Sequence, residues 1–209
     1  MSQFDLVILG GGSGGYAAAL RGSQLGLSVA LIEADKVGGS CLHRGCIPTK
    51  ALLHSAEIAD GARDGSHFGV KSTFEGIDMV GVNSYKDGVI NKLYKGLSGL
   101  VKSRGVTFIE GHGKLVAKDT VEVNGTLYTG KNVILATGSY AKTLPGLEID
   151  GERIITSDHG TKLNQFIEVN ASIPVPLNDA RPVIVSGVLE LTGQNESGIF
   201  YRLNAAGPG

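Results

Sequence analysis

Short runs of consecutive apolar residues alternate with longer segments in which apolar residues recur every three or four positions. Residues 4–9 and 28–32 are apolar, β-branched runs, which are typical of buried parallel strands. Between them, residues 16–26 are rich in Ala and Leu and close on a glycine, which predicts a helix. The three segments together predict one strand–helix–strand unit.

The same alternation continues to about residue 159. The further predicted elements are helices over 48–59 and 83–104, a polar connection over 61–80, strands over 106–109 and 131–138, and a β-meander over 114–128 with a turn at Asn124-Gly125. This order predicts a three-layer α/β domain with a parallel central sheet and a small β-meander. Residues 160–209 hold several prolines and one strand-like run at 183–185. We therefore expect a first domain over 1–159 and a divergent tail over 160–209.

Composition narrows the function classes. The chain has 209 residues, of which 42% are apolar and 19% charged, and its net charge is −1. Such a charge gives no electrostatic basis for binding nucleic acid or an anionic membrane. No apolar run reaches the about 18 residues of a membrane-spanning helix, and the first residues lack the basic start of a secretory signal. We expect a cytoplasmic protein, in which a structural disulfide is unusual.

Gly10, Gly12 and Gly15 fit the pattern G-x-G-x-x-G directly after the first predicted strand. The first glycine permits a tight turn, the second lets a pyrophosphate approach the backbone, and the third lets the helix pack closely on the sheet. Glu33 follows eighteen residues after Gly15, where a carboxylate is expected to bind ribose hydroxyls. These residues predict a dinucleotide site. The alternative is a glycine-rich turn beside a surface glutamate, and the motif alone does not separate FAD from NAD.

The only two cysteines, Cys41 and Cys46, are separated by four residues. In a regular helix their Cα atoms would lie ~8.7 Å apart, whereas a disulfide requires about 4.4–6.8 Å. A disulfide therefore requires a break in the helix, which Gly45 makes easy, with Pro48 in the first turn that follows. Cys46 would then lie at a helix start that favours its thiolate, with Lys50 one turn later. Cys41 would be the better thiol for exchange with an external disulfide.

Three interpretations of this pair remain open. The cysteines are a redox disulfide, two inert buried thiols, or half of a metal site that includes His43 and His54. A zinc site requires four ligands, this spacing is not usual for zinc, and the sequence holds no second cysteine pair. We favour the redox disulfide and expect no bound metal.

Residues 38–53, Gly-Gly-Ser-Cys-Leu-His-Arg-Gly-Cys-Ile-Pro-Thr-Lys-Ala-Leu-Leu, resemble the redox segment of the flavin-dependent pyridine nucleotide–disulfide oxidoreductases. Within that family they are most similar to the dihydrolipoyl dehydrogenase branch. The resemblance covers about residues 3–159 and implies a Rossmann-like FAD/NAD(P)-binding fold, truncated relative to the family. It departs at His43 and Arg44, where the family commonly has Asn-Val.

The resemblance also implies a set of site residues. Cys41 and Cys46 would be catalytic, as the interchange thiol and the thiol in contact with the flavin. The cofactor-binding positions would be Gly10, Gly12, Ser13, Gly14, Gly15, Glu33, Ala34, Gly39, Ser40, Cys41, Cys46, Lys50, Gly113, Ala136, Thr137, Gly138 and Ser139. Lys50 would lie near the flavin and Gly113 near the adenine. By themselves, Lys50 is equally typical of a solvated helix and Thr137-Gly138 of a plain turn.

The function implied by the resemblance is oxidation of dihydrolipoamide through the Cys41–Cys46 disulfide and FAD to NAD+. The family enzyme is a homodimer that serves the lipoyl groups of 2-oxoacid dehydrogenase complexes. Residues 183–193 lack the family's second G-x-G-x-x-G, and His159 falls in a loop segment rather than in the pattern of the catalytic base. We therefore expect a fragment without its NAD site or interface domain, and with weak or no turnover alone. The alternatives are a flavin-binding module without catalysis, or a reductase of another disulfide or of a metal ion.

Overall fold

The computed structural model describes residues 2–143, 146, 148–151, 154–162, 167–170, 187–195 and 198–205. Its helices are α1 (Ser13–Gln24), α2 (Gly39–His43), α3 (Cys46–Asp64), the 3-10 helix η1 (Gly65–Phe68), α4 (Met79–Ser103) and α5 (Ser157–Gly160). Its strands are β1 (Ser2–Leu9), β2 (Val29–Glu33), β3 (Thr107–Glu110), β4 (Gly113–Ala117), β5 (Thr120–Val123), β6 (Thr126–Leu135), β7 (Ile167–Asn170), β8 (Gly187–Asn195) and β9 (Gly198–Ala205).

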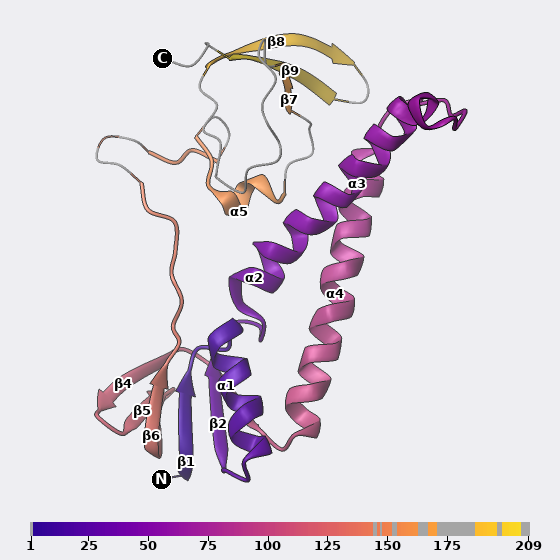
Figure 1. Ribbon diagram of the computed structural model, residues 1–209. Helices are drawn as coiled ribbons and strands as arrows, with labels where there is room; N and C mark the ends of the chain where they lie inside the picture. The colour runs from indigo at the N-terminus through magenta and orange to yellow at the C-terminus, as the bar shows by residue number, and fades with distance from the viewer. Residues whose placement is uncertain are drawn as a thin grey trace.

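The first six strands form one sheet in the order β3-β2-β1-β6-β5-β4 (Figure 1). Strands β3, β2, β1 and β6 are parallel to one another. Strands β5 and β4 continue the sheet beyond β6 in antiparallel pairing. Strand β1 lies in the middle, where Ile8 pairs with Leu31 of β2 on one side and Ile134 of β6 on the other. The predicted strand–helix–strand unit is confirmed as β1, α1 and β2.

Different layers cover the two faces of the parallel strands. One face, formed by Leu6, Ile8, Val29 and Leu31, packs against Ala19 of α1 and Val101 of α4. The other face, formed by Val7, Leu9, Ala30 and Ile32, packs against Val121 and Val123 of β5. Because successive residues of a strand point to opposite faces, both sets must be apolar. The predicted three-layer α/β architecture is confirmed as helices, parallel strands and meander.

Strand β6 belongs to both the parallel sheet and the meander. The turn before it places Asn124 at φ 49 and Gly125 at φ 79, which is the left-handed backbone expected of a two-residue hairpin. Its first residues pair with β5, and the strand then runs beside β1 to Leu135. The prediction of a separate strand over 131–138 is therefore wrong in its bounds, because one continuous strand, β6, pairs with both β5 and β1.

Helices α3 and α4 pack against each other as a long pair (Figure 1). Helix α3 continues past residue 61 to Asp64, so the predicted polar connection over 61–80 is shorter than expected. Arg63 supports this last turn, since its guanidinium lies 3.2 Å from Asp60 Oδ1 and 4.3 Å from the centre of the Phe74 ring.

The ends of α4 have clear sequence causes. The Asp78 side chain accepts a hydrogen bond from the Val80 N–H at 3.0 Å and caps the helix start, which satisfies one of the unpaired N–H groups there. Gly105 follows the last helical turn, as predicted. The helix therefore begins four residues before the predicted bound and ends where expected.

Beyond β6 the chain leaves the sheet and reaches α5 (Figure 1), which contacts the helices. Arg44 Nη1 lies 3.8 Å from Asp158 Oδ2, and the buried Lys86 donates to the Thr161 carbonyl at 2.9 Å. His159, which we expected in a loop, lies in α5 because its Nδ1 accepts from the Thr156 N–H at 3.1 Å and closes a capping box.

The last described strands form a separate sheet in the order β7-β9-β8. Strands β8 and β9 pair as a hairpin, and β7 runs parallel to β9. The predicted strand-like run at 183–185 lies outside the described residues. The division of the chain at residue 159 stays a prediction.

Candidate functional site

Loops that follow three parallel strands meet at one end of the sheet. Strands β1, β2 and β6 end at Leu9, Glu33 and Leu135. The Gly10 N–H donates to the Ile32 carbonyl, and the Ala136 N–H donates to the Leu9 carbonyl, both at 2.8 Å. The predicted residues of the glycine loop, Glu33 with Ala34, and the segment 136–139 are thus brought together, as is usual for ligand sites at the carboxyl ends of parallel strands.

The glycines of this loop differ in what requires them. A Cβ at Gly10 would overlap the Ala136 carbonyl, and a Cβ at Gly15 would overlap the Gly10 carbonyl. Backbone packing therefore excludes a side chain at both positions. A Cβ at Gly12 would meet only the Gly39 Cα, at an ordinary 3.7 Å, and one at Gly14 would meet nothing within 4 Å. At Gly14 the described part of the chain leaves open space, whereas at Gly12 a Cβ would fit in ordinary contact with Gly39.

Helix α1 begins in a way that suits an anion. Its N-cap is Gly12, which has no side chain to accept from the first N–H groups, and its first turn holds no acidic residue. Ser13 and Gly14 at the start of the helix are exposed. Unpaired N–H groups and the positive end of the helix dipole bind phosphate at such starts. This helix start, which no side chain caps, fits the pyrophosphate of a dinucleotide.

Glu33 is held in place by the backbone. Its Oε2 accepts from the Gly11 N–H at 2.6 Å, and its Oε1 accepts from the Asp35 N–H at 3.0 Å. A carboxylate has about four acceptor positions, so these two bonds orient Glu33 and leave capacity for ribose hydroxyls. Ala34 beside it is exposed.

Cys41 and Cys46 are joined as a disulfide, and the helix break that it requires is confirmed. Helix α2 ends at His43, helix α3 begins at Cys46, and Gly45 between them has φ −132 and ψ −107. The two cysteine Cα atoms lie 4.7 Å apart, far closer than the ~8.7 Å of a continuous helix. Cys46 is the first residue of α3, and Pro48 falls in its first turn, as the sequence predicted.

The surroundings of the disulfide are partly open. Cys46 and Lys50 are exposed, whereas Cys41 is half-buried. His43 between them contacts the Val37 carbonyl through Nε2 at 3.0 Å and packs edge-on against the Tyr94 ring of α4, with ring centres 5.4 Å apart. His43 and Arg44, the two departures from the family pattern, therefore attach this segment to α4 and to α5.

The remaining predicted residues lie around the same end of the sheet. A Cβ at Gly113 would overlap the Leu9 side chain and lie 3.0 Å from those of Ile32 and Val121, so core packing by itself favours a glycine there. Thr137, Gly138 and Ser139 are exposed immediately beyond β6. Ser40 is also exposed, within α2.

Two important residues were missing from the predicted set. The Gly11 N–H orients Glu33, and the Gly11 carbonyl accepts from the Gly38 N–H at 2.8 Å. This bond joins the glycine loop to the cysteine segment. The available signal was the run of neighbouring glycines at both places, which indicates close backbone approach.

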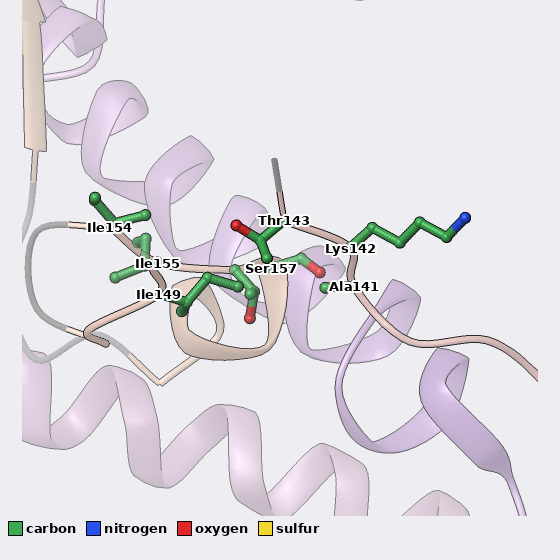
Figure 2. Close-up of a pocket in the computed structure, with 8 residues that line it drawn as sticks. Ala141, Lys142, Thr143, Ile149, Ile154, Ile155 and Ser157 are labelled. Carbon is green, nitrogen blue, oxygen red and sulfur yellow. The ribbon is translucent and has the colours of Figure 1, made fainter. Parts of the chain in front are cut away.

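A cavity of about 360 Å3 lies elsewhere, between the connection after β6 and the segment that leads into α5 (Figure 2). Figure 2 shows Ile149, Ile154 and Ile155 grouped together, with Thr143 and Ser157 nearby. The residues predicted for the cofactor or the disulfide are not among its described lining residues, so we assign it no part in the site.

The described residues show no group of three or more His, Cys, Asp or Glu side chains that could hold a metal ion. The two histidines considered for such a site have other contacts, His43 with the Val37 carbonyl and His54 with Glu57 Oε2 at 3.3 Å. Among the helices that the structure describes, none combines the length and the apolarity needed to cross a membrane.

Comparisons with known proteins agree with this fold. The family model of the pyridine nucleotide-disulphide oxidoreductases matches residues 4–187. The crystal structure of LpdA from Mycobacterium tuberculosis matches with a TM-score of 0.69 at 25% identity, over 82% of this chain and 40% of that chain. The match supports the Rossmann-like fold predicted from the sequence.

Curated relatives give the same picture. The chain is 41% identical over 178 residues to dihydrolipoyl dehydrogenase of Bacillus subtilis, which covers 79% of this chain and 38% of that protein. It is 41% identical over 169 residues to the mitochondrial dihydrolipoyl dehydrogenase of Pisum sativum, covering 78% and 34%. It is 40% identical over 169 residues to leghemoglobin reductase of Vigna unguiculata, covering 78% and 32%. The chain therefore spans less than two-fifths of the length of these three relatives.

Proposed function

This chain belongs to the pyridine nucleotide-disulphide oxidoreductase family, and we propose that it is the FAD-binding, disulfide-bearing part of a flavin-dependent disulfide oxidoreductase. The observation that carries this proposal is the Cys41–Cys46 disulfide, whose preceding segment lies directly against the glycine loop. A redox pair attached to a dinucleotide site requires no further element to bring the two together. The similarity to dihydrolipoyl dehydrogenases supports the same function.

The residues of the site fit the FAD that this family binds. The start of α1 at Gly12 would hold the pyrophosphate, and Glu33 would accept from the ribose hydroxyls. Gly113 and the segment 137–139 would border the cofactor, and Lys50 would add a positive charge one turn after Cys46. When bound, FAD supplies a two-electron acceptor for the reduced cysteine pair.

The cysteine pair would take its electrons by dithiol exchange. A substrate thiolate attacks the Cys41 sulfur, which forms a mixed disulfide and releases Cys46 as a thiolate. The second substrate thiolate then attacks the substrate sulfur of that mixed disulfide, which releases Cys41 and closes the substrate disulfide. Two electrons pass to the cysteine pair, and the two substrate thiol protons go to the cysteine thiolates or to solvent.

The choice of Cys41 as the attacked sulfur rests on the leaving group. Cys46 is the first residue of the nineteen-residue helix α3, and a helix start favours a thiolate there. The better-stabilised thiolate leaves faster. Exposure alone would favour the opposite order, because Cys46 is more exposed than Cys41.

The wider activity is proposed from the relatives. Dihydrolipoamide is the proposed dithiol, NAD+ the proposed final acceptor, and the lipoyl groups of 2-oxoacid dehydrogenase complexes the proposed partners of a homodimer. We also propose the division at residue 159, since the disulfide, the glycine loop and the six-stranded sheet all precede it. The second candidate is a flavin-binding module without catalysis, because the helix start at Gly12 and the oriented Glu33 would hold a dinucleotide whether or not the disulfide reacts.

The test combines FAD binding with thiol counting. The purified chain is titrated with FAD, and its disulfide form is separately treated with dihydrolipoamide, alkylated and analysed by mass. We expect FAD to bind and both cysteines of the wild type to become alkylated. In a Cys46→Ser variant, dihydrolipoamide should expose no new thiol. Failure of FAD to bind, or a disulfide that dihydrolipoamide leaves intact, would contradict the proposal.

A further inference from the structure

Two glycine pairs meet where the cysteine segment crosses the start of α1. The Gly38 N–H donates to the Gly11 carbonyl at 2.8 Å. The next residues of the two segments, Gly12 and Gly39, also approach closely. A Cβ at Gly39 would lie 2.6 Å from the Gly12 Cα. We call these four residues the glycine joint.

Two independent features of the backbone disfavour any side chain at position 39. Its backbone has φ +61, which L side chains rarely adopt. Its Cβ would meet backbone rather than a flexible side chain, so the segment itself would have to move. Restoring an ordinary carbon–carbon separation requires a shift of about 1 Å.

Such a shift would reach the disulfide. Gly39 is the first residue of α2, and Cys41 follows two residues later in the same short helix. The disulfide then connects Cys41 to the start of α3. A displacement at Gly39 is therefore passed to the sulfur pair. We expect the five-residue α2 to move rather than Gly12, because the Gly12 carbonyl accepts from the Tyr16 N–H of α1 at 2.9 Å.

The geometry points to Gly39 as a positioning residue that sets the separation between the redox disulfide and the dinucleotide site through backbone contact with Gly12. This role rests on the proposed function and differs from the direct cofactor contact that the sequence suggested for Gly39. It predicts that a side chain at position 39 slows electron transfer without removing any group that binds FAD or exchanges disulfides.

The experiment compares Gly39→Ala with Gly26→Ala in the full chain. Gly26 has a similar positive φ, +79, but a Cβ there would meet nothing within 4 Å, so the control carries the backbone strain without the collision. We expect Gly39→Ala to bind FAD with near wild-type affinity. Its bound flavin should be reduced by dihydrolipoamide about 100-fold more slowly, as a misplacement of about 1 Å predicts, whereas Gly26→Ala should resemble the wild type.

Two results would overturn the role. One is equal reduction rates for the two variants. The other is loss of FAD affinity in Gly39→Ala with an unchanged rate for the flavin that remains bound, which would make Gly39 a cofactor contact only.

Amide hydrogen exchange separates this role from the proposed function. Without any cofactor, the Gly38 amide should exchange at least about tenfold faster in Gly39→Ala than in Gly26→Ala, and equal exchange would overturn the joint. If dithiol does not reduce the wild-type flavin, the proposed function fails. Exchange of the Gly38 amide then decides by itself whether the contact between Gly39 and Gly12 exists. If Gly39→Ala does not fold, the test uses the wild type with and without FAD. FAD should then slow exchange of the Gly38 amide, and no slowing would overturn the joint.

Discussion

The two ends of the parallel strands differ in whether their polar groups are paired by side chains of the chain itself. Where β2 begins, Asp5 lies 2.7 Å from the Lys131 ammonium and accepts from the Ser28 N–H and hydroxyl. Where the same strands end, α1 starts at Gly12 with no side chain of its own to cap it. Glycine in place of a capping side chain costs a helix only a few tenths of a kcal/mol, so this start is left open at little cost in stability. The difference fits our proposal that the carboxyl end receives a group from outside the chain.

The strongest test separates glycines that the fold requires from glycines that a ligand requires. Gly15→Ala should destabilise the chain by about 3 kcal/mol, because its Cβ would overlap the Gly10 carbonyl. Gly14→Ala, in open space on the same helix, should be neutral or stabilising by up to about 1 kcal/mol. Urea unfolding measures both. Equal stability of the two variants would show that the loop is not packed as described.

The next test fills the open helix start. Gly12→Asp should fold as stably as the wild type, since a Cβ fits there and aspartate is a good N-cap. Its carboxylate would stand where the pyrophosphate binds, so FAD affinity should fall about 100-fold. Gly88→Asp, which adds the same charge on the exposed face of α4, serves as the control in calorimetric titrations. Unchanged FAD affinity in Gly12→Asp would place the cofactor elsewhere.

A smaller effect concerns the second helix start at this end, that of α3. Cys41→Ser leaves Cys46 as the only thiol, and Cys46→Ser leaves only Cys41. At neutral pH we expect iodoacetamide to modify Cys46 about tenfold faster than Cys41, because the start of α3 favours the thiolate. A faster reaction of Cys41 would reverse the roles proposed for the two sulfurs.

The smallest effect belongs to the amino end. The Lys131 ammonium, followed by Ser28, holds the pKa of the Asp5 carboxyl well below its ordinary value of 3.8. A lowered carboxyl pKa contributes stability above that value, and the contribution is lost as the pH falls below it. Lys131→Gln should therefore lose less melting temperature between pH 7 and pH 3 than the wild type, by no more than about 2 °C for so exposed a pair. A larger loss in the variant would contradict the pairing.

Local rules predicted much of this molecule. The apolar runs of β1 and β2, the turn at Asn124-Gly125 and the helix break at Gly45 each depend on residues close in sequence, and the structure shows all three. The bounds of α3 and β6 were missed because they depend on partners far along the chain. Arg63 packs over Phe74 beyond the end of α3, and β6 lies between β1 and β5.

The candidate site divides in the same way. Motif spacing indicated Gly10, Glu33 and both cysteines, because each has a chemical requirement visible in the sequence. The glycine runs indicated close backbone approach but not that Gly38 would bond to Gly11, and nothing indicated the contact of Arg44 with Asp158. Both contacts join segments whose separation in space is decided by packing, and neither residue type signals its partner.

The most direct measurement of the central claim is the visible absorption of the FAD-loaded wild-type chain during anaerobic addition of dihydrolipoamide, beside the Cys41→Ser/Cys46→Ser double variant. We expect the flavin absorption to fall in the wild type and to persist in the double variant, because electrons reach the flavin through the disulfide. An absorption that persists in the wild type while its cysteines become reduced would contradict the account. The chain would then be a flavin-binding module whose disulfide passes no electrons to the flavin.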